Sequence, residues 1–465
     1  MKKTLTVIAV IAILVVVGTG LATITRTPDT QQSASNGSAE MERDAHEASG
    51  AEANTTFRPI RQRVLAPAPL APAVGWVGEV NVGSSDTWEP AIAADPSSAY
   101  VYTMYNRFGG PKACSSHCPS PAMMVRVSPD GGATWGNEKF LCTCQGVAGQ
   151  YDPVLFVTST GTVYATLMNS NTIVFTKSSD HGATWSTPLK VSGKSWGDKP
   201  WIGASANGVD VYIAFESRSV YYITSSHNSG ATWSAPIKVN GDTGRYRYAN
   251  GFAVLPNGTA VLSDSSYPGT SGKTSGQVDI EVWRTTNGGT SWSRVVVDSA
   301  VYTGVDFDTS STTTIAADAV GSLVIEYSGA PTLGTNGHVW VRRSTDGGVT
   351  WSAATQLADG TGNASFPAIT GGASGNFRLL WQDSRGGAWN TWYRASTDGG
   401  VTWSADLKIS DATTGATYKT AAGYGGPYGD YNTIDITNAG KTVAVWGEGQ
   451  SFSTGPGGIW FNRQT

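Results

Sequence analysis

The stretch Ser128-Pro-Asp-Gly-Gly-Ala-Thr-Trp135 is the first of six copies of one eight-residue motif. The others begin at Ser178, Ser226, Thr285, Ser344 and Ser396, and each ends in tryptophan. Their Asp or Asn residues lie 50, 48, 59, 59 and 52 residues apart, and a period near 50 indicates a repeat architecture. Ser or Thr and Asp or Asn hydrogen-bond the local backbone, and Gly permits positive φ, so each copy predicts a tight turn.

These motifs resemble the Asp box, or BNR repeat, of sialidases and related β-propellers. The resemblance covers residues 76–465 and implies an all-β propeller of four-stranded blades. It also implies that the motifs lie on the face opposite the active site, so that their Asp residues are structural.

The strand pattern predicts seven blades, whereas the sialidases themselves have six, which is the alternative count. Three apolar, alternating runs precede each motif and one follows it. After the sixth motif three runs remain without a fourth strand, and Val77–Val82 is an orphan strand before the first blade. We therefore expect this N-terminal strand to complete the last blade and close the ring.

The composition excludes several classes of protein. Only 14% of the 465 residues are charged and 57 are glycine, which argues against helical bundles and coiled coils. The formal net charge is -4 and no basic patch is visible, so we expect no nucleic-acid partner.

The N-terminus predicts export, to the medium or to the cell surface. Lys2 and Lys3 precede an apolar run, and the small residues Gly20 and Ala22 fit a cleavage site, so residues 1–22 are interpreted as a signal peptide. An uncleaved membrane anchor is the alternative, and no other segment is expected to contact a membrane. Residues 23–75 are predicted to be a disordered Ser/Ala/Pro-rich linker.

The four cysteines of the chain are consistent with export. Cys114 and Cys118 flank one loop, and Cys142 and Cys144 follow the first blade's fourth strand. We expect two disulfides that join the first couple to the second, because exported cysteine pairs usually bridge. A zinc site with His117 nearby is the alternative.

Polar residues recur where the second strand of each blade ends, and this position faces the predicted funnel. They are Asn106, Asn169, Glu216, Asp264, Glu326, Asp383 and Glu448. Arg107, Arg218 and Arg385 lie close by in the sequence. Such a ring of carboxylates and arginines could bind a sugar, or it could form ion pairs between blades.

Aromatic residues also crowd the predicted funnel loops, where they could stack on sugar rings. They are Trp88, Tyr151, Trp196, Trp201, Tyr246, Tyr248, Tyr267, Tyr424, Tyr428 and Tyr431. Core packing between blades accounts better for Trp201. The Gly-rich loop 424–431, which includes Asp430, is the best single stretch for a site.

The C-terminal run from Tyr431 to Glu448 resembles the end of a sialidase domain. The resemblance implies that Tyr431 is the nucleophile and Glu448 orients an arginine; Glu216 or Glu326 could activate the tyrosine. The chain departs from the sialidase pattern at Trp88, which stands where an arginine should grip the substrate. Asp152 is the nearest replacement for the acid/base Asp.

Seven residues are the candidate substrate-binding groups: Arg107, Arg218, Arg247, Arg385, Asp383, Trp88 and Asp430. The four arginines are the only source for the sialidase arginine triad.

Two classes of function remain. The first is a glycoside hydrolase for extracellular glycans, which would use Tyr431, or a carboxylate pair such as Asp152 and Glu216. The second is a non-catalytic propeller that binds glycan or protein; a polysaccharide lyase is a smaller third option. We expect a monomer with no required cofactor and no catalytic metal. A structural calcium ion at Asp306 and Asp308 is the alternative to a solvated turn.

Overall fold

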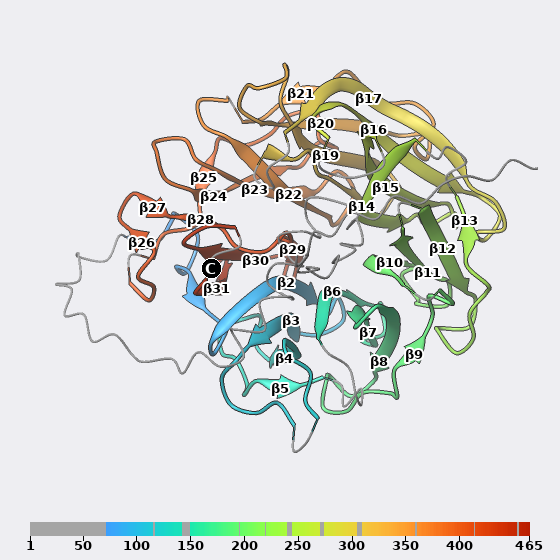
Figure 1. The fold of residues 1–465 in the computed structure, drawn as a ribbon, viewed down its shortest axis with the longest axis horizontal. Coiled ribbons are helices and arrows are strands. Elements are labelled where there is room, and N and C mark those ends of the chain that lie inside the picture. The colour runs from blue at the N-terminus through green and yellow to red at the C-terminus, as the bar shows by residue number, and fades with distance from the viewer. Residues whose placement is uncertain are drawn as a thin grey trace, which may run out of the picture. The chain divides into compact units, whose positions relative to one another are not determined.

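The computed structural model describes residues 71–465, except 115–116, 142–148, 195, 219, 240–243, 270–273, 305–308, 359, 413 and 453–454. These residues belong to one compact unit and form seven blades in a ring (Figure 1). The inner strands of the blades lie around the middle of this ring. The fold is therefore the predicted all-β propeller with seven blades.

Blades 1 to 3 are consecutive four-stranded antiparallel sheets. Blade 1 contains β2 (Asp86–Ala94), β3 (Val101–Phe108), β4 (Ala122–Ser128) and β5 (Lys139–Phe140). Blade 2 contains β6 (Gln150–Val157), β7 (Val163–Asn169), β8 (Thr172–Ser178) and β9 (Leu189–Lys190). Blade 3 contains β10 (Asp198–Ala204), β11 (Val211–Ser217), β12 (Val220–Ser226) and β13 (Ile237–Lys238).

Blades 4 to 6 repeat this order. Blade 4 contains β14 (Arg245–Val254), β15 (Ala260–Pro268), β16 (Gly276–Thr285) and β17 (Ser293–Thr303). Blade 5 contains β18 (Thr313–Ala317), β19 (Leu323–Gly329), β20 (His338–Ser344) and β21 (Thr355–Gln356). Blade 6 contains β22 (Ala364–Gly371), β23 (Phe377–Asp383), β24 (Asn390–Ser396) and β25 (Leu407–Lys408).

Blade 7 joins the two ends of the described chain. It contains β29 (Thr433–Ile436), β30 (Thr442–Gly449), β31 (Gly457–Arg463) and β1 (Val80–Asn81). Val80 lies opposite Phe461 in the antiparallel pair of β1 and β31, which confirms the predicted closure by the N-terminal strand. The short strand β28 (Gly426–Pro427) also pairs with β30, and β26 (Lys419–Thr420) pairs with β27 (Gly423–Tyr424).

The six repeated motifs form turns between the third and fourth strands. In the first copy, Ser128 Oγ donates to Asp130 Oδ1 over 2.8 Å, and the Thr134 amide donates to the same oxygen over 2.8 Å. Gly131 and Gly132 have φ of 69° and 85°. Trp135 packs edge-on against Phe461 of blade 7, with ring centroids 5.0 Å apart. The aspartate thus holds the turn, and the tryptophan fastens its blade to the preceding one.

Bulges break the register of the inner strands in five blades: β2, β6, β10, β14 and β22. In four of them the bulged residue has positive φ: Glu89, Asp152, Lys199 and Phe366, at 48–55°. Each of these four residues precedes a proline. A left-handed non-glycine residue costs about 1–3 kcal/mol, and such strain collects at functional sites. The bulged inner strands are therefore candidates for the location of a functional site.

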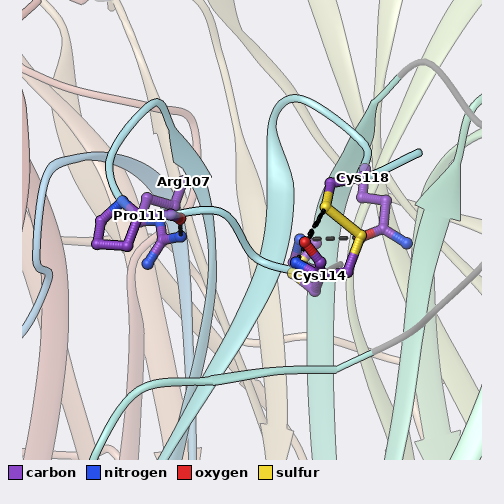
Figure 2. The surroundings of a disulfide bond; sticks show 6 residues. Arg107, Pro111, Cys114 and Cys118 are labelled. Carbon is purple, nitrogen blue, oxygen red and sulfur yellow. Dashed lines mark hydrogen bonds between the residues drawn. A yellow bond between two sulfur atoms is a disulfide. The ribbon is translucent and has the colours of Figure 1, made fainter. Parts of the chain in front are cut away.

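One disulfide lies in the loop between β3 and β4. It joins Cys114 to Cys118, whose Cα atoms are 5.4 Å apart (Figure 2). The predicted pairing of the first cysteine couple with the second is therefore wrong, because Cys118 is already within bonding distance of Cys114. Cysteines in a disulfide have no thiolate to bind zinc, so Cys114 and Cys118 cannot be ligands of a Cys₄ zinc site. Cys142 and Cys144 lie outside the described residues.

Other predictions concern parts of the chain that are not described. Residues 1–22, most of the linker 23–75, and both Asp306 and Asp308 lie outside the described residues. Within the described ranges, no helix has the length and apolar character needed to cross a membrane.

Candidate functional site

Ionisable side chains from four blades meet in one buried cluster, which we call the central cluster. It contains Glu89 of β2, Asp152 of β6, Lys199 of β10, and Asp430 in the loop before β29. Glu89 and Asp152 are 0% exposed, Lys199 2% and Asp430 4%. The three bulged residues are the same position in consecutive blades, so the repeat itself brings them together.

Lys199 links the two aspartates. Its Nζ lies 3.4 Å from Asp152 Oδ1 and also contacts Asp430 Oδ2. The backbone amide of Lys199 donates to Asp152 Oδ2 over 3.3 Å. A buried ammonium between two carboxylates offsets part of the desolvation cost of all three groups.

Two tyrosines complete the cluster. Tyr431 donates to Asp152 Oδ1 over 3.1 Å, and Tyr248 of β14 donates to Asp430 Oδ2 over 2.7 Å. The Lys199 ammonium lies 5.0 Å from the ring centroid of Tyr431 and 5.3 Å from that of Tyr248. Burial, followed by the charge of Asp152, raises the pKa of Tyr431 well above its usual value. Tyr431 is therefore a neutral hydrogen-bond donor here, and its phenolate is disfavoured.

Glu89 is fixed by two donors. Its Oε2 accepts from the Asn106 side-chain amide and from the Asp152 backbone amide, both over 2.8 Å. These bonds hold Glu89 next to Asp152, so that Glu89, Asp152 and Asp430 each place a carboxylate oxygen within 4.8 Å of the others. Three such oxygens could hold a metal ion, but the Lys199 ammonium already contacts two of these carboxylates as their cation.

An aromatic wall adjoins the cluster at Trp88, the residue before Glu89. Tyr428 stacks on Trp88 with centroids 5.3 Å apart, and Phe452 meets it edge-on at 5.9 Å. Phe452 also stacks on Phe366, the bulged residue of blade 6, at 6.1 Å. Trp88 is therefore packed among rings, and these largely buried rings border the charged groups.

Gly429 allows the loop 424–431 to pass across Trp88. It has φ of +82°, and a Cβ at this position would fall on the indole ring and 2.8 Å from the Glu89 amide nitrogen. Asp430 and Tyr431 follow directly, so this close approach sets the position of two cluster residues.

We expect Gly429→Ala to lower the free energy of unfolding by more than about 1 kcal/mol, because both the backbone conformation and the space exclude a side chain. Thermal unfolding and near-ultraviolet circular dichroism would measure the effect. Gly440→Ala is the matched control: its φ is +73°, but nothing lies within 4 Å of its Cβ position. Equal losses in the two variants would contradict the role of the Trp88 contact.

The structure brings together some of the predicted site residues and separates others. Tyr431, Asp152 and Asp430 lie in the central cluster, with Trp88 beside it. Arg107 pairs with Glu138 and donates to the Pro111 carbonyl of the cysteine loop (Figure 2). Arg247 pairs with Glu281 and Asp264 in blade 4.

The remaining arginine candidates also lie elsewhere. Arg385 pairs with Asp383 and Asp406 in blade 6, and Arg218 is exposed at a turn. The four arginines thus occupy four different blades and have different surroundings. Among the described residues, the expected arginine triad is therefore not assembled.

Glu448 and Glu216 also have other surroundings. Glu448 Oε2 lies 2.7 Å from Lys419 Nζ, so it pairs with a lysine where the resemblance implied an arginine. Glu216 is buried near Tyr221, whose pKa its charge helps to raise after burial and Asp264.

Three residues of the central cluster were not predicted from the sequence as site residues: Glu89, Lys199 and, as a hydrogen-bond donor, Tyr248. A signal for the first two is present in the sequence. Glu89-Pro90, Asp152-Pro153 and Lys199-Pro200 occur at the same place in three consecutive blades. A polar residue before proline in a buried inner strand indicates a bulge that turns this side chain out of the ladder.

Glu326 of β19 shows that the second-strand carboxylates are not one functional ring. It is 0% exposed, and neither carboxylate oxygen has a hydrogen-bond partner within the described part of the chain. Burial raises its pKa well above the usual value. The folded state therefore favours the protonated acid.

We expect Glu326→Gln to stabilise the protein at pH 8 and to have little effect at pH 4. Because the pKa is higher in the folded than in the unfolded state, the cost of Glu326 is absent below the unfolded pKa of about 4.3 and grows as pH rises. A folded pKa that is one unit above the unfolded pKa corresponds to about 1.4 kcal/mol, so a gain of at least about 1 kcal/mol is expected. Urea unfolding at both pH values would measure it; a loss at pH 8 would show that the carboxylate has an ionic partner.

Comparison with known proteins identifies the fold. No protein-family profile and no curated protein matches the chain. Among solved structures, a polysaccharide lyase of family PL25, an ulvan lyase bound to -[GlcA(1-4)Rha3S]-, matches with a TM-score of 0.51 and 14% identity over 84% of this chain and 95% of that chain. The chain thus shares the β-propeller fold of this lyase.

Two other solved structures show lower similarity. Hadza microbial sialidase Hz136 has a TM-score of 0.46 and 13% identity, and covers 85% of this chain and 98% of its own. The α-L-arabinanase of Penicillium chrysogenum has a TM-score of 0.47 and 13% identity over 84% and 98%. At these identities the similarity concerns the fold alone.

Proposed function

We propose that the protein is an exported glycan-processing propeller, and specifically a glycoside hydrolase in which Asp152 and Asp430 are the catalytic carboxyl groups. The observation that supports this most directly is the pair itself: two buried aspartates from different blades that share one ammonium and each accept from a tyrosine hydroxyl. Glycosidases use two such groups, one to protonate the glycosidic oxygen and the other to attack the sugar or to activate water.

The spacing supports a retaining reaction. One carboxylate oxygen from each of Glu89, Asp152 and Asp430 lies within 4.8 Å of the other two. Retaining enzymes hold the two carboxyl groups about 5–5.5 Å apart, whereas inverting enzymes leave about 6.5–9.5 Å for a water molecule. Glu89 would position Asp152 through its backbone amide, and Tyr431 would donate to Asp152 instead of acting as the nucleophile.

Two further observations support export and a carbohydrate substrate. The Cys114–Cys118 disulfide supports export, because disulfides persist in oxidising compartments. The similarly folded ulvan lyase supports a carbohydrate substrate.

A non-catalytic glycan-binding propeller is the second candidate. It is favoured by the burial of the central cluster, where Glu89, Asp152 and Asp430 are each at most 4% exposed. A substrate needs access to catalytic carboxyl groups, whereas a propeller that only binds a glycan does not need these carboxyl groups to be accessible.

The test is release of new reducing ends from a panel of glycans by the full chain and by Asp152→Asn and Asp430→Asn. Loss of a catalytic acid or base lowers the rate by about a hundredfold or more. Asp210→Asn, a partly exposed aspartate that pairs with His227 in blade 3, is the matched control and should retain full activity. Glycan binding without any hydrolysis would favour the second candidate, and the absence of both would exclude a glycan function.

A further inference from the structure

A cleft lies between blades 2 and 3, which are neighbours in the ring (Figure 1). Its volume is about 520 Å³, within the range of about 300–1,000 Å³ that is usual for sites of small ligands. Blade 2 contributes the turn between β6 and β7, part of β8 and the motif that begins at Ser178. Blade 3 contributes the turn between β10 and β11 and the motif that begins at Ser226.

This cleft is separate from the central cluster. In an antiparallel four-stranded blade, the turn between the first and second strands lies at the same end as the turn between the third and fourth strands. The cleft is built from these turns. Asp152 and Lys199 of the central cluster lie near the beginning of β6 and β10, which is the other end of the blades.

Lys177 of β8 gives the cleft a positive charge. Among the described residues that line the cleft, it is the only charged one. Its Nζ donates to the Ser229 carbonyl over 2.8 Å, which leaves two of its three N–H groups for other acceptors. Asp180, the acid of the adjacent motif, is held within its own turn, where it accepts from Ser178 and Thr184. The cleft thus offers cationic donors to a ligand.

Neutral groups in the same wall suit a sugar. Asn207 Oδ1 accepts from the Ser205 hydroxyl over 2.8 Å and from the Val209 amide over 3.1 Å, so the side-chain amino group of Asn207 remains as a donor. Thr162 contributes a hydroxyl group and Trp185 an indole ring. Asn207 is exposed, and Thr162 and Trp185 are partly exposed, so a ligand in solution can reach them. An indole ring can pack on the apolar face of a sugar, a contact that an inorganic anion does not use.

We propose that this cleft is a second glycan site, which takes a sugar unit that carries a carboxylate or a sulfate group. The acidic group accepts charge-assisted hydrogen bonds from the Lys177 ammonium. Asn207 and Thr162 bond the remaining oxygens of the sugar unit, and Trp185 contacts its ring. The inference goes beyond the proposed hydrolysis, because such a site holds a glycan on the propeller without any catalytic group.

The test is binding of the full chain to three short oligosaccharides that differ in one unit, which is a uronic acid, a sulfated sugar or a neutral sugar, and to inorganic sulfate. At low ionic strength, we expect at least one acidic form to bind at least tenfold more tightly than the neutral form, and the form that binds identifies the acidic group. Added salt should reduce this ratio, because it screens the attraction. Equal binding of all three forms, or binding of none, would overturn the inference. Inorganic sulfate that binds as tightly as the acidic oligosaccharides would also overturn it.

Asn207→Asp separates charge from folding. Aspartate keeps an oxygen that can accept from Ser205 and Val209, but it places a negative charge in the wall, so the acidic oligosaccharide should bind at least tenfold less tightly. Asn257→Asp is the matched control, because Asn257 Oδ1 accepts from the Thr259 amide over 3.0 Å in the corresponding turn of blade 4. This second substitution lies outside the cleft and should leave the affinity unchanged. Unchanged affinity in Asn207→Asp would contradict the proposal.

The hydrolase proposal and the proposal of a second glycan site can fail separately. Folded Asp152→Asn should still bind the acidic oligosaccharide, because the central cluster lies at the other end of the blades. Loss of this binding would place the ligand at the central cluster and overturn the inference. A chain that binds the acidic oligosaccharide but hydrolyses no glycan would exclude the proposed hydrolase and support the second site.

Discussion

Lys199→Met should lower the free energy of unfolding by about 3–5 kcal/mol, because it leaves Asp152 and Asp430 buried without their shared cation. Methionine fills a similar volume, so the loss would come from charge and not from a cavity. Urea unfolding at pH 7 would measure it. Glycan hydrolysis should also be lost, because the two aspartates could not both remain ionised and in place.

The double variant Lys199→Met/Asp430→Asn provides the control for this effect. It removes one uncompensated carboxylate and should recover part of the lost stability, whereas two independent sites would show additive losses. Lys190→Met, on an exposed part of β9, should change stability by less than about 0.5 kcal/mol. A loss below about 1 kcal/mol in Lys199→Met would mean that water reaches the aspartates.

Lys419→Met should lower the free energy of unfolding by a similar amount, about 3–5 kcal/mol, because Lys419 holds the strand that closes the ring. Lys419 Nζ contacts Glu79 Oε1 and lies 2.7 Å from Glu448 Oε2, and its side chain is 1% exposed. Glu79 directly precedes β1, and its backbone amide donates to Asp411 over 3.0 Å. The lysine therefore fastens the N-terminal strand to blade 7, and its removal would leave two buried glutamates facing each other.

The stability lost in Lys419→Met should depend on pH. Burial, followed by the charge of Glu448, raises the pKa of Glu79, and burial raises the pKa of Glu448. Their folded pKa values lie above the unfolded value, so the protonated forms favour folding, and stability falls as pH rises from about 4.3 upward. Without Lys419 the free energy of unfolding should fall more steeply with pH, so the variant should lose more stability relative to the unmodified protein at pH 8 than at pH 4.5.

Amide hydrogen exchange would show which strands are destabilised in Lys419→Met. Faster exchange confined to β1 and β31 would agree with a weakened closure, whereas uniform acceleration would contradict it. Lys419→Met/Glu79→Gln should regain part of the lost stability. The hydrogen bonds of Asp152 and Asp430 described above involve neither residue, so the central cluster should retain its contacts in the folded variant.

The spacing of the turn motifs, with the orphan strand at Val77–Val82, was enough to predict a seven-bladed ring and its closure. Local physics explains this success. Each motif encodes its own turn through a hydroxyl, a carboxylate or amide, and glycines within eight residues, and its period determines the blade length. Tyr431, Asp152 and Asp430 were named as separate candidates for a site, and the structure places them in one cluster.

The sequence did not predict features that depend on which side chains are buried and on which residues they contact. Lys199 is one of 31 basic residues, and although Lys199-Pro200 indicates a bulge, the sequence does not show that this bulge places the ammonium between two aspartates. Likewise, Arg107, Arg247 and Arg385 were candidates for an anion site. Each nevertheless pairs with carboxylates near its own blade, which only the strand register reveals. The bond from Cys114 to Cys118 was missed for a similar reason, because it depends on how a short loop bends.

The sequence by itself thus determined the architecture, because repeated turns and alternating apolar strands act over short distances along the chain. Only the tertiary structure decided which charges meet at the centre. Bulges in three separate blades bring Glu89, Asp152 and Lys199 together, and Asp430, which lies 231 residues beyond Lys199, joins them from a loop. Electrostatic pairing acts through space, and its strength depends on burial, which is a property of the closed ring and not of any one blade.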